Sequence, residues 1–336
     1  MGEYNIAIAG VTGAVGKVFL SILEERSFPI KNIKFLASSR SAGKKIEFCG
    51  ESVEVEELKK DSFKNIDIAF FSAGASRSKE FAPYAVSRGT VVIDNSSAFR
   101  MVDDIPLVVP EVNRESIFQH KGIIANPNCS TIIMAVAIKP IYDLSRISRV
   151  IVSTYQAVSG AGAMGIVELD KQVGLILQKR YDEIKPEVFP VQIAFNVIPH
   201  IDVFLENGYT KEEMKMTGET KKIFNDPEMQ ISATAVRVPV YTSHSESISV
   251  ETKDKIDIDH LKNSLKNAPG IILKDDYKNK IYPTVLDSSN KDHVYIGRIR
   301  EDLSCINGIT FWAVGDQLRK GAALNAVQIA EEWIKK

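Results

Sequence analysis

Residues 5–16 read NIAIAGVTGAVG, and this stretch decides the fold of the N-terminal half. Residues 5–9 form a short apolar run typical of a buried strand, and residues 15–25 have helical spacing. The glycines between them allow a tight turn and a close approach of the backbone to a pyrophosphate, whose charge a helix N-terminus stabilises. We therefore predict a dinucleotide site at Gly10, Gly13 and Gly16. The alternative is a tight connection without a ligand.

The segment after the second expected strand, 33–37, indicates which dinucleotide binds. An NAD site usually places an acidic residue there, but residues 37–44 read ASSRSAGK. Arginine can hold a 2′-phosphate through its planar fork of donors, and serines add hydrogen bonds. The cluster around Arg40 and Ser41 therefore favours NADP. The alternative is a solvated basic loop.

The two halves of the chain differ in pattern. In the first half, strands expected at 68–71 and 91–94 continue the alternation with helices, which predicts a parallel sheet covered by helices. From about residue 147, strands dominate and predict an α+β domain on a largely antiparallel or mixed sheet. The expected strands there are 150–155, 232–238, 245–251, 293–300 and 309–314, and the expected helices are 164–179, 211–224, 259–267 and 316–334.

Composition narrows the class of protein. The 336 residues are 44% hydrophobic and 25% charged, as in an ordinary globular protein large enough for two domains. A net charge of −1 gives no reason to expect nucleic acid or an anionic membrane as partner. With neither a signal-peptide pattern nor a long apolar run, we expect a cytoplasmic protein. Three scattered cysteines predict neither a disulfide framework nor a metal site.

One of these cysteines lies at a helix start. Residues 123–131 read IIANPNCST and precede an apolar helical run, 132–138, which we expect to end at Pro140. The dipole and free N–H groups at a helix N-terminus favour a thiolate, so Cys129 is the candidate nucleophile. A small buried hydrophobe is the usual role of a lone cysteine and suits Cys49 and Cys305 better.

A thiolate that attacks an acyl group needs a proton shuttle. The chain has five histidines, and His244 stands out in residues 237–247, RVPVYTSHSES, between two expected strands. Alone, such a histidine is more often structural than catalytic. We keep His244 as a candidate because of the motifs around it.

Several separated motifs together resemble one family. They are residues 126–131, NPNCST; residues 156–162, QAVSGAG; residues 237–240, RVPV, leading to His244; residues 96–100, SSAFR; and residues 212–215, EEMK. In this order, and with the glycine-rich turn and C-terminal helix, they resemble the aspartate-β-semialdehyde dehydrogenases over essentially the whole chain. The resemblance implies a Rossmann-type NADP-binding domain, 1–128 plus 316–336, and a mixed-sheet catalytic and dimerisation domain, 129–315.

The resemblance also implies a role for each site residue. Cys129 is the nucleophile, His244 the general acid/base, and Gln156 orients the acyl intermediate. Arg237 holds the substrate α-carboxylate and Glu212 attracts its ammonium group. Arg100, Asn128 and Lys215 bind phosphate, and the residues that contact NADP are Gly10, Thr12, Gly13, Ala14, Val15, Arg40, Ser41, Ser159, Gly160 and Gln317. The alternative for Arg100, Glu212 and Lys215 is a charge that faces solvent. For Arg237 it is a salt bridge at a strand end.

The implied reaction is the NADPH-dependent reduction of L-aspartyl-4-phosphate to L-aspartate-4-semialdehyde and phosphate, through a Cys129 thioester, on the route to lysine, methionine and threonine. The resemblance also implies a homodimer or homotetramer. Related phosphate-releasing reductases, such as N-acetyl-γ-glutamyl-phosphate reductase or glyceraldehyde-3-phosphate dehydrogenase, are the nearest alternatives. A non-catalytic NADP-binding sensor would lack the nucleophile, base or substrate arginine, and the chain has all three.

Overall fold

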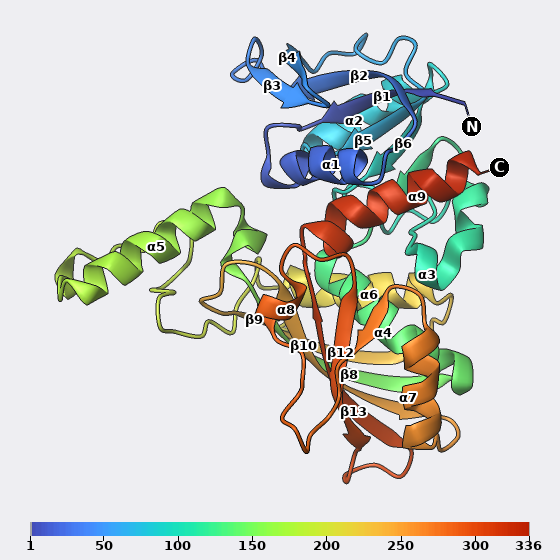
Figure 1. Ribbon diagram of the computed structural model, residues 1–336, viewed down its shortest axis with the longest axis vertical. Helices are drawn as coiled ribbons and strands as arrows, with labels where there is room; N and C mark the ends of the chain where they lie inside the picture. The colour runs from blue at the N-terminus through green and yellow to red at the C-terminus, as the bar shows by residue number, and fades with distance from the viewer. Residues whose placement is uncertain (1, 336) are drawn as a thin grey trace. The chain divides into compact units, whose positions relative to one another are not determined.

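The computed structural model describes residues 2–335, and the chain forms two compact units (Figure 1). Unit 1 comprises Met1–Cys129, Lys222–Phe224 and Gly321–Lys336, and unit 2 comprises Ser130–Lys221 and Asn225–Lys320. Within residues 2–335, no helix is both long enough and apolar enough to cross a membrane.

Unit 1 contains a seven-stranded sheet in the order β3-β4-β2-β1-β5-β6-β7. All pairs are parallel except β3 with β4, which form an antiparallel hairpin at one edge. The strands are β1 Tyr4–Ala9, β2 Ile30–Ala37, β3 Lys45–Phe48, β4 Glu51–Glu57, β5 Ile68–Phe71, β6 Val91–Asp94 and β7 Ile123–Ala125. This largely parallel sheet confirms the expected Rossmann-type half; the hairpin is an element that the sequence analysis missed.

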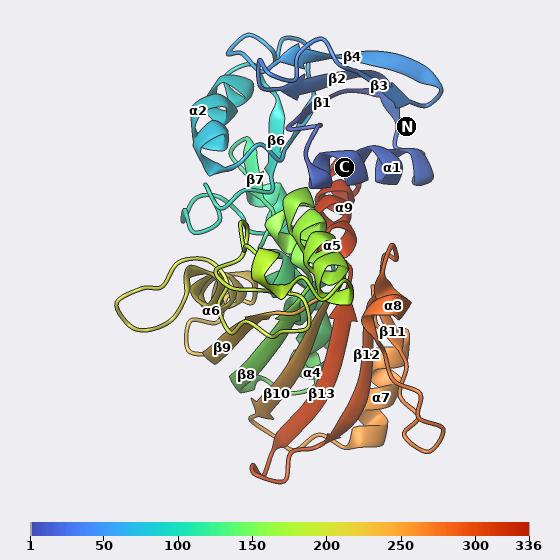
Figure 2. The ribbon, with the colours of Figure 1, turned by 90° about the vertical axis from the view of Figure 1, so that its left-hand side faces the viewer.

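Helices cover both faces of this sheet (Figures 1 and 2). One core joins α1 and α9 to β5 through side chains such as Phe19, Phe70 and Val327, and a second core joins α2 to the opposite face through Ala82 and Phe71. The helices of the unit are α1 Ala14–Glu25, α2 Ala75–Val86, α3 Pro110–Asn113, the 3-10 helix Arg114–Gln119 and α9 Leu324–Ile334.

Unit 2 contains a six-stranded mixed sheet in the order β11-β12-β13-β10-β8-β9. The two edge pairs are parallel and the three central pairs antiparallel, as the mixed-sheet prediction requires. The strands are β8 Ile147–Gln156, β9 Gln230–Arg237, β10 His244–Thr252, β11 Ile271–Leu273, β12 Val294–Glu301 and β13 Gly308–Gly315. Long strands β8 and β10 place their ends beside one another, where the candidate residues gather.

The remaining helices are α4 Cys129–Leu144, α5 Ala163–Leu177, α6 Lys211–Ile223, α7 Ile258–Asn267, α8 Val285–Ser288 and the short 3-10 helices Val158–Ala161 and Tyr181–Glu183. The prediction that Pro140 ends its helix is wrong, because α4 continues to Leu144. Proline removes one backbone hydrogen bond, but the next turn buries Ile141 and Pro140 itself, which offsets that loss.

The single helix predicted over 316–334 is also wrong at its start. Residues Arg319–Ala323 form a π-helical turn before α9. The Asp316 carboxylate accepts hydrogen bonds from the backbone N–H groups of Leu318 and Arg319, at 2.8 and 3.0 Å. These are the bonds of a helix N-cap, so Asp316 lies at the start of the helical segment, but the first turn is π-helical and the α-helix begins only at Leu324.

Candidate active site

Cys129 is half-buried and is the first residue of α4. The loop before it is pinned by the C-terminal segment of unit 1: Asn325 Nδ2 donates to Asn126 Oδ1 at 2.7 Å, and Asn126 Nδ2 donates to the Ala322 carbonyl at 3.2 Å. A Cβ added to Gly321 would lie 3.0 Å from the Cys129 Cβ. The thiol is therefore presented at a helix N-terminus, whose dipole favours negative charge.

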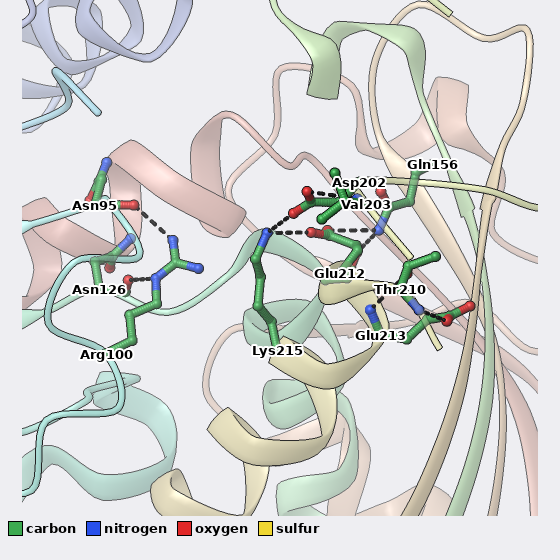
Figure 3. A network of polar contacts seen from close by, with 11 residues as sticks. Asn95, Arg100, Asn126, Gln156, Asp202, Val203, Thr210, Glu212, Glu213 and Lys215 are labelled. Carbon is green, nitrogen blue, oxygen red and sulfur yellow. Dashed lines mark hydrogen bonds and ion pairs between the residues drawn. The ribbon is translucent and has the colours of Figure 1, made fainter. Parts of the chain in front are cut away.

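Arg100 is fixed against the same loop. Its Nε donates to the Asn126 carbonyl at 2.9 Å and its Nη2 to the Asn95 carbonyl at 2.7 Å, and only 8% of the residue is exposed (Figure 3). Asn128 is also buried. These residues follow β6 and β7, whose carboxyl ends lie at the same edge of the parallel sheet as the Gly10 turn. That edge is where ligands of such sheets bind.

Asp94, at the end of β6, organises the start of this loop. Its carboxylate accepts hydrogen bonds from the Ser78 and Ser96 hydroxyls at 2.6 and 2.7 Å. Burial raises the pKa of Asp94, while these hydroxyls and the charge of Arg100 oppose the shift. Asp94 was not among the predicted site residues, although its place at the end of a buried strand is a signal for such a role.

The glycine-rich turn has the conformation that a dinucleotide site needs. Gly10 has φ +94°, and a Cβ there would lie 2.4 Å from the Ser72 carbonyl oxygen. A Cβ on Gly16 would lie 2.4 Å from the Gly10 carbonyl oxygen, so α1 packs directly on the turn. The N-cap of α1 is Gly13, which has no side chain to cover the N–H groups of the first turn. These residues fit a pyrophosphate.

Arg40 and Ser41 lie in the turn that follows β2, where Arg40 is exposed. The Ser41 N–H donates to the Ser38 carbonyl at 2.8 Å, which closes the turn. This turn follows the strand that pairs with β1, which is the ribose-binding position of this fold.

In unit 2, Gln156 connects the start of α4 to α6. Its Nε2 donates to the hydroxyl of Ser130, the residue after Cys129, at 2.6 Å, and to Glu212 Oε1 at 3.3 Å. Gln156 ends β8 and is fully buried. Ser130 was not among the predicted site residues, and only its place beside the cysteine could have indicated it.

Glu212 and Lys215 form an ion-pair network on the first turns of α6 (Figure 3). Lys215 Nζ lies 3.0 Å from Glu212 Oε2 and 2.8 Å from Asp202 Oδ2. Burial lowers the pKa of Lys215, but the two carboxylates outweigh it and the net shift is upward. The network supplies one cation and two anions, so it can exchange partners with a substrate that carries both charges.

His244 is fully buried at the start of β10. Its Nδ1 accepts a hydrogen bond from the Ala157 N–H at 3.1 Å, so the neutral ring carries its proton on Nε2. The Nε2 atom has no hydrogen-bond partner among the described residues. Burial and then the charge of Arg237 lower the pKa of His244 to about 3, while Glu212 opposes the shift. The ring is therefore neutral near pH 7.

Arg237 ends β9 and lies beside the histidine. Its Nη1 donates to the Ala157 carbonyl at 2.6 Å, and its guanidinium lies 5.9 Å from the centre of the Phe189 ring. A Cβ on Gly160 would lie 2.7 Å from Arg237 Nη1 and 3.4 Å from His244 Nε2. Unit 2 thus brings Gly160, Arg237 and His244 together.

Ser159 and Gln317, both predicted to contact the cofactor, contact each other. Gln317 Nε2 donates to the Ser159 hydroxyl at 2.5 Å, and its Oε1 accepts the Ser243 N–H at 2.7 Å. Gln317 therefore supports the residue next to His244, a connection that the sequence did not indicate.

The expectation that Cys49 is a buried small hydrophobe is wrong. Cys49 is exposed and lies between β3 and β4, with φ +50°, in the turn of the hairpin that the sequence analysis missed. Cys305 is half-buried. Among residues 2–335 there is no group of three or more His, Cys, Asp or Glu side chains that could hold a metal ion.

Both halves of the chain match known protein families. Residues 5–120 match the family described as "Semialdehyde dehydrogenase, NAD binding domain", and residues 138–320 match "Semialdehyde dehydrogenase, dimerisation domain". The sequence is 55% identical to aspartate-semialdehyde dehydrogenase of Aquifex aeolicus over 335 residues, which cover 99% of this chain and 98% of the relative. It is 51% identical to the Bacillus subtilis enzyme of that name, with 98% and 97% covered.

Solved structures give the same result. The structure matches aspartate semialdehyde dehydrogenase II of Vibrio cholerae, solved in complex with ASA, with a TM-score of 0.97 and 49% identity, over 100% of this chain and 99% of that one. It also matches the Candida albicans enzyme solved with NADP, with a TM-score of 0.76 and 25% identity, over 98% of each chain.

Proposed function

The chain belongs to the aspartate-semialdehyde dehydrogenase family, and we propose that it works through a Cys129 thioester with NADP as its cofactor. It is a phosphorylating semialdehyde dehydrogenase of aspartate-family amino-acid biosynthesis, and its N-terminal half is an NAD(P)-binding domain. The reaction is the reduction of L-aspartyl-4-phosphate to L-aspartate-4-semialdehyde and phosphate. The observation that carries the proposed mechanism is the place of Cys129 at the first residue of α4, behind a loop that also fixes Arg100.

The first step is an acyl transfer. The Cys129 thiolate attacks the carbonyl carbon (C4) of the acyl phosphate, a C–S bond forms, the C–O bond to phosphate breaks, and phosphate leaves. Arg100, Asn128 and Lys215 hold the phosphate. Gln156 orients the acyl group; its hydrogen bond to Ser130, the residue that follows Cys129, supports this role.

The second step releases the aldehyde. Bound NADPH supplies a hydride to the thioester carbon. The thiohemiacetal on Cys129 then collapses: the C–S bond breaks, the aldehyde leaves and the thiolate is restored. We assign the accompanying proton transfer to His244 through Nε2, because Nδ1 already accepts the bond from Ala157. An anionic substrate would favour the protonated ring, which burial disfavours in the free protein.

The substrate needs two anion sites and one cation site. Arg237 can bind the α-carboxylate with two parallel hydrogen bonds, and Phe189 and the Ala157 carbonyl hold its guanidinium in place. Glu212 can accept the α-ammonium group in exchange for Lys215, which then turns to phosphate. The Vibrio cholerae relative was solved in complex with ASA, which supports a substrate of this class.

The preference for NADP over NAD rests on Arg40 and Ser41, which follow β2 where an NAD-specific site would place an acidic residue. Thr12, Ala14 and Val15 at the start of α1 would line the pyrophosphate, and the Ser159–Gln317 pair with Gly160 would contact the remainder of the cofactor. The Candida albicans relative solved with NADP supports the preference.

The match of residues 138–320 to a dimerisation domain supports a homo-oligomer, and we propose a homodimer or a homotetramer. The proposed domain limits are 1–128 plus 316–336 and 129–315. A cytoplasmic location remains a prediction from the sequence.

A substrate panel tests the proposed function. NADP reduction is followed at the nicotinamide absorbance with phosphate and either L-aspartate-4-semialdehyde, N-acetylglutamate semialdehyde or glyceraldehyde-3-phosphate. We expect phosphate-dependent turnover with the first substrate alone, and a higher kcat/KM with NADP than with NAD. Turnover with only one of the other aldehydes would keep the cysteine chemistry and refute the assigned roles of Arg237 and Glu212.

A further inference from the structure

The loop that carries Arg100 is held by a lysine from another part of the chain. Lys222, in the last turn of α6, donates from Nζ to the backbone carbonyls of Arg100, Val102 and Ile105 at 2.8, 2.7 and 2.8 Å. An ammonium group has three donors, and three carbonyls of one short loop converge on it. No motif in the sequence analysis included Lys222.

Few other interactions hold the loop in this conformation. Met101 and Val102 are 55% and 44% exposed, so the segment buries little apolar surface. Its two internal backbone hydrogen bonds each close a single turn. They run from the Val102 N–H to the Phe99 carbonyl and from the Ile105 N–H to the Val102 carbonyl, both at 3.1 Å. Exposed turns of this kind open easily, whereas charge-assisted bonds to a single ammonium group restrain them.

Arg100 is therefore fixed at both ends. Its carbonyl oxygen accepts from Lys222, and its guanidinium donates to the carbonyls of Asn95 and Asn126. The bond from Lys222 fixes the position of the Arg100 backbone, from which the side chain extends. A long side chain transmits a backbone shift of about 1 Å directly to its charged end.

We propose that Lys222 is a positioning residue for the phosphate subsite: it fixes the backbone of residues 100–105 so that Arg100 meets the phosphate in the geometry for bidentate binding. This inference rests on the proposed function, in which Arg100 binds phosphate. Lys222 itself does not contact the substrate. Its removal leaves Cys129, His244 and Arg237 in place and changes the affinity for phosphate.

The test compares Lys222→Met with wild type in the phosphate-dependent oxidation of L-aspartate-4-semialdehyde, with phosphate, aldehyde and NADP varied in turn. We expect the KM for phosphate to rise about tenfold, as when a charged hydrogen bond is weakened. The KM for the aldehyde and for NADP, and kcat at saturating phosphate, should stay within about twofold. Lys222→Arg keeps the charge, but its planar fork does not match three converging carbonyls, so the KM for phosphate should rise here too.

Lys221→Met is the matched control, because the neighbouring ammonium makes no hydrogen bond or ion pair within residues 2–335. An unchanged phosphate KM in both Lys222 variants would overturn the inference. A parallel rise in all three KM values with a lower Tm would also overturn it, since that pattern indicates only a structural role. If Lys222→Met does not fold, Lys222→Arg decides between these outcomes. Inactive wild-type protein would instead refute the proposed function.

Discussion

At the scale of single residues, the geometry around Gly160 links substrate binding to proton transfer. The backbone of Gly160 leaves space for both the Arg237 guanidinium and the His244 ring, which no side chain at this position could share. Both groups also bond to Ala157, one to its carbonyl and one to its N–H. One peptide segment therefore positions the carboxylate-binding arginine and the proton-transfer histidine together.

Replacing Gly160 with Ala should lower kcat/KM for L-aspartate-4-semialdehyde by about a hundredfold, because the added methyl group displaces both side chains by a fraction of an ångström or more. Steady-state kinetics measure the loss, and NADP titration separates it from any change at the cofactor. Gly174→Ala in α5 is the control, since a Cβ there meets nothing within 4 Å. Wild-type kinetics for Gly160→Ala would show that Arg237 and His244 tolerate displacement or act elsewhere.

At the scale of elements, the sequence predicted the helices and strands that have a clear local residue pattern. It missed features that depend on tertiary contacts. The strand–turn–helix at residues 5–25 is local, and the glycines report a backbone requirement that no packing can override. The end of α4 is different: Pro140 is a correct local signal against a helix, but burial of Ile141 outweighs it. The hairpin β3–β4 was missed because both strands are largely exposed and contain no apolar run.

The candidate site divides in the same way. The positions of Cys129 and of the glycine-rich turn follow from helix and strand starts that the sequence displays. The supports of the site do not: Ser130, Asn325 and Lys222 act through bonds to residues that are 26, 199 and 117 to 122 positions away. No spacing pattern encodes contacts of that sequence separation.

At the scale of the whole molecule, two buried ionisable groups on β10 make the stability depend on pH in opposite directions. Burial raises the pKa of Glu246 well above 4.5, and both of its oxygens lack a hydrogen-bond partner among the described residues. The stability that neutral Glu246 contributes is complete below pH 4.5 and is lost as pH rises towards the folded-state pKa. His244, whose pKa is lowered to about 3, contributes stability that is complete above pH 6.5 and is lost as pH falls.

Glu246→Gln should therefore gain stability relative to wild type as pH rises from about 5 to about 8, because Gln keeps the shape and cannot ionise. The difference in the free energy of unfolding should grow by up to about 1.4 kcal/mol per pH unit while the folded group stays protonated. Urea unfolding at several pH values measures it. Glu251→Gln on the same strand, where the carboxylate is half-exposed and paired with Arg149, is the control and should show no such trend. A pH-independent difference for Glu246→Gln would mean that the carboxyl is ionised in the folded protein.

The measurement that tests the central claim most directly is the turnover of Cys129→Ser with L-aspartate-4-semialdehyde, phosphate and NADP, together with its affinity for NADP. A serine hydroxyl keeps the shape but is a far weaker nucleophile, so turnover should be nearly abolished while NADP binds as in wild type. Cys49→Ser and Cys305→Ser, which replace the exposed and the other half-buried thiol, should keep full activity. Near-normal turnover of Cys129→Ser would contradict the covalent route through the first residue of α4.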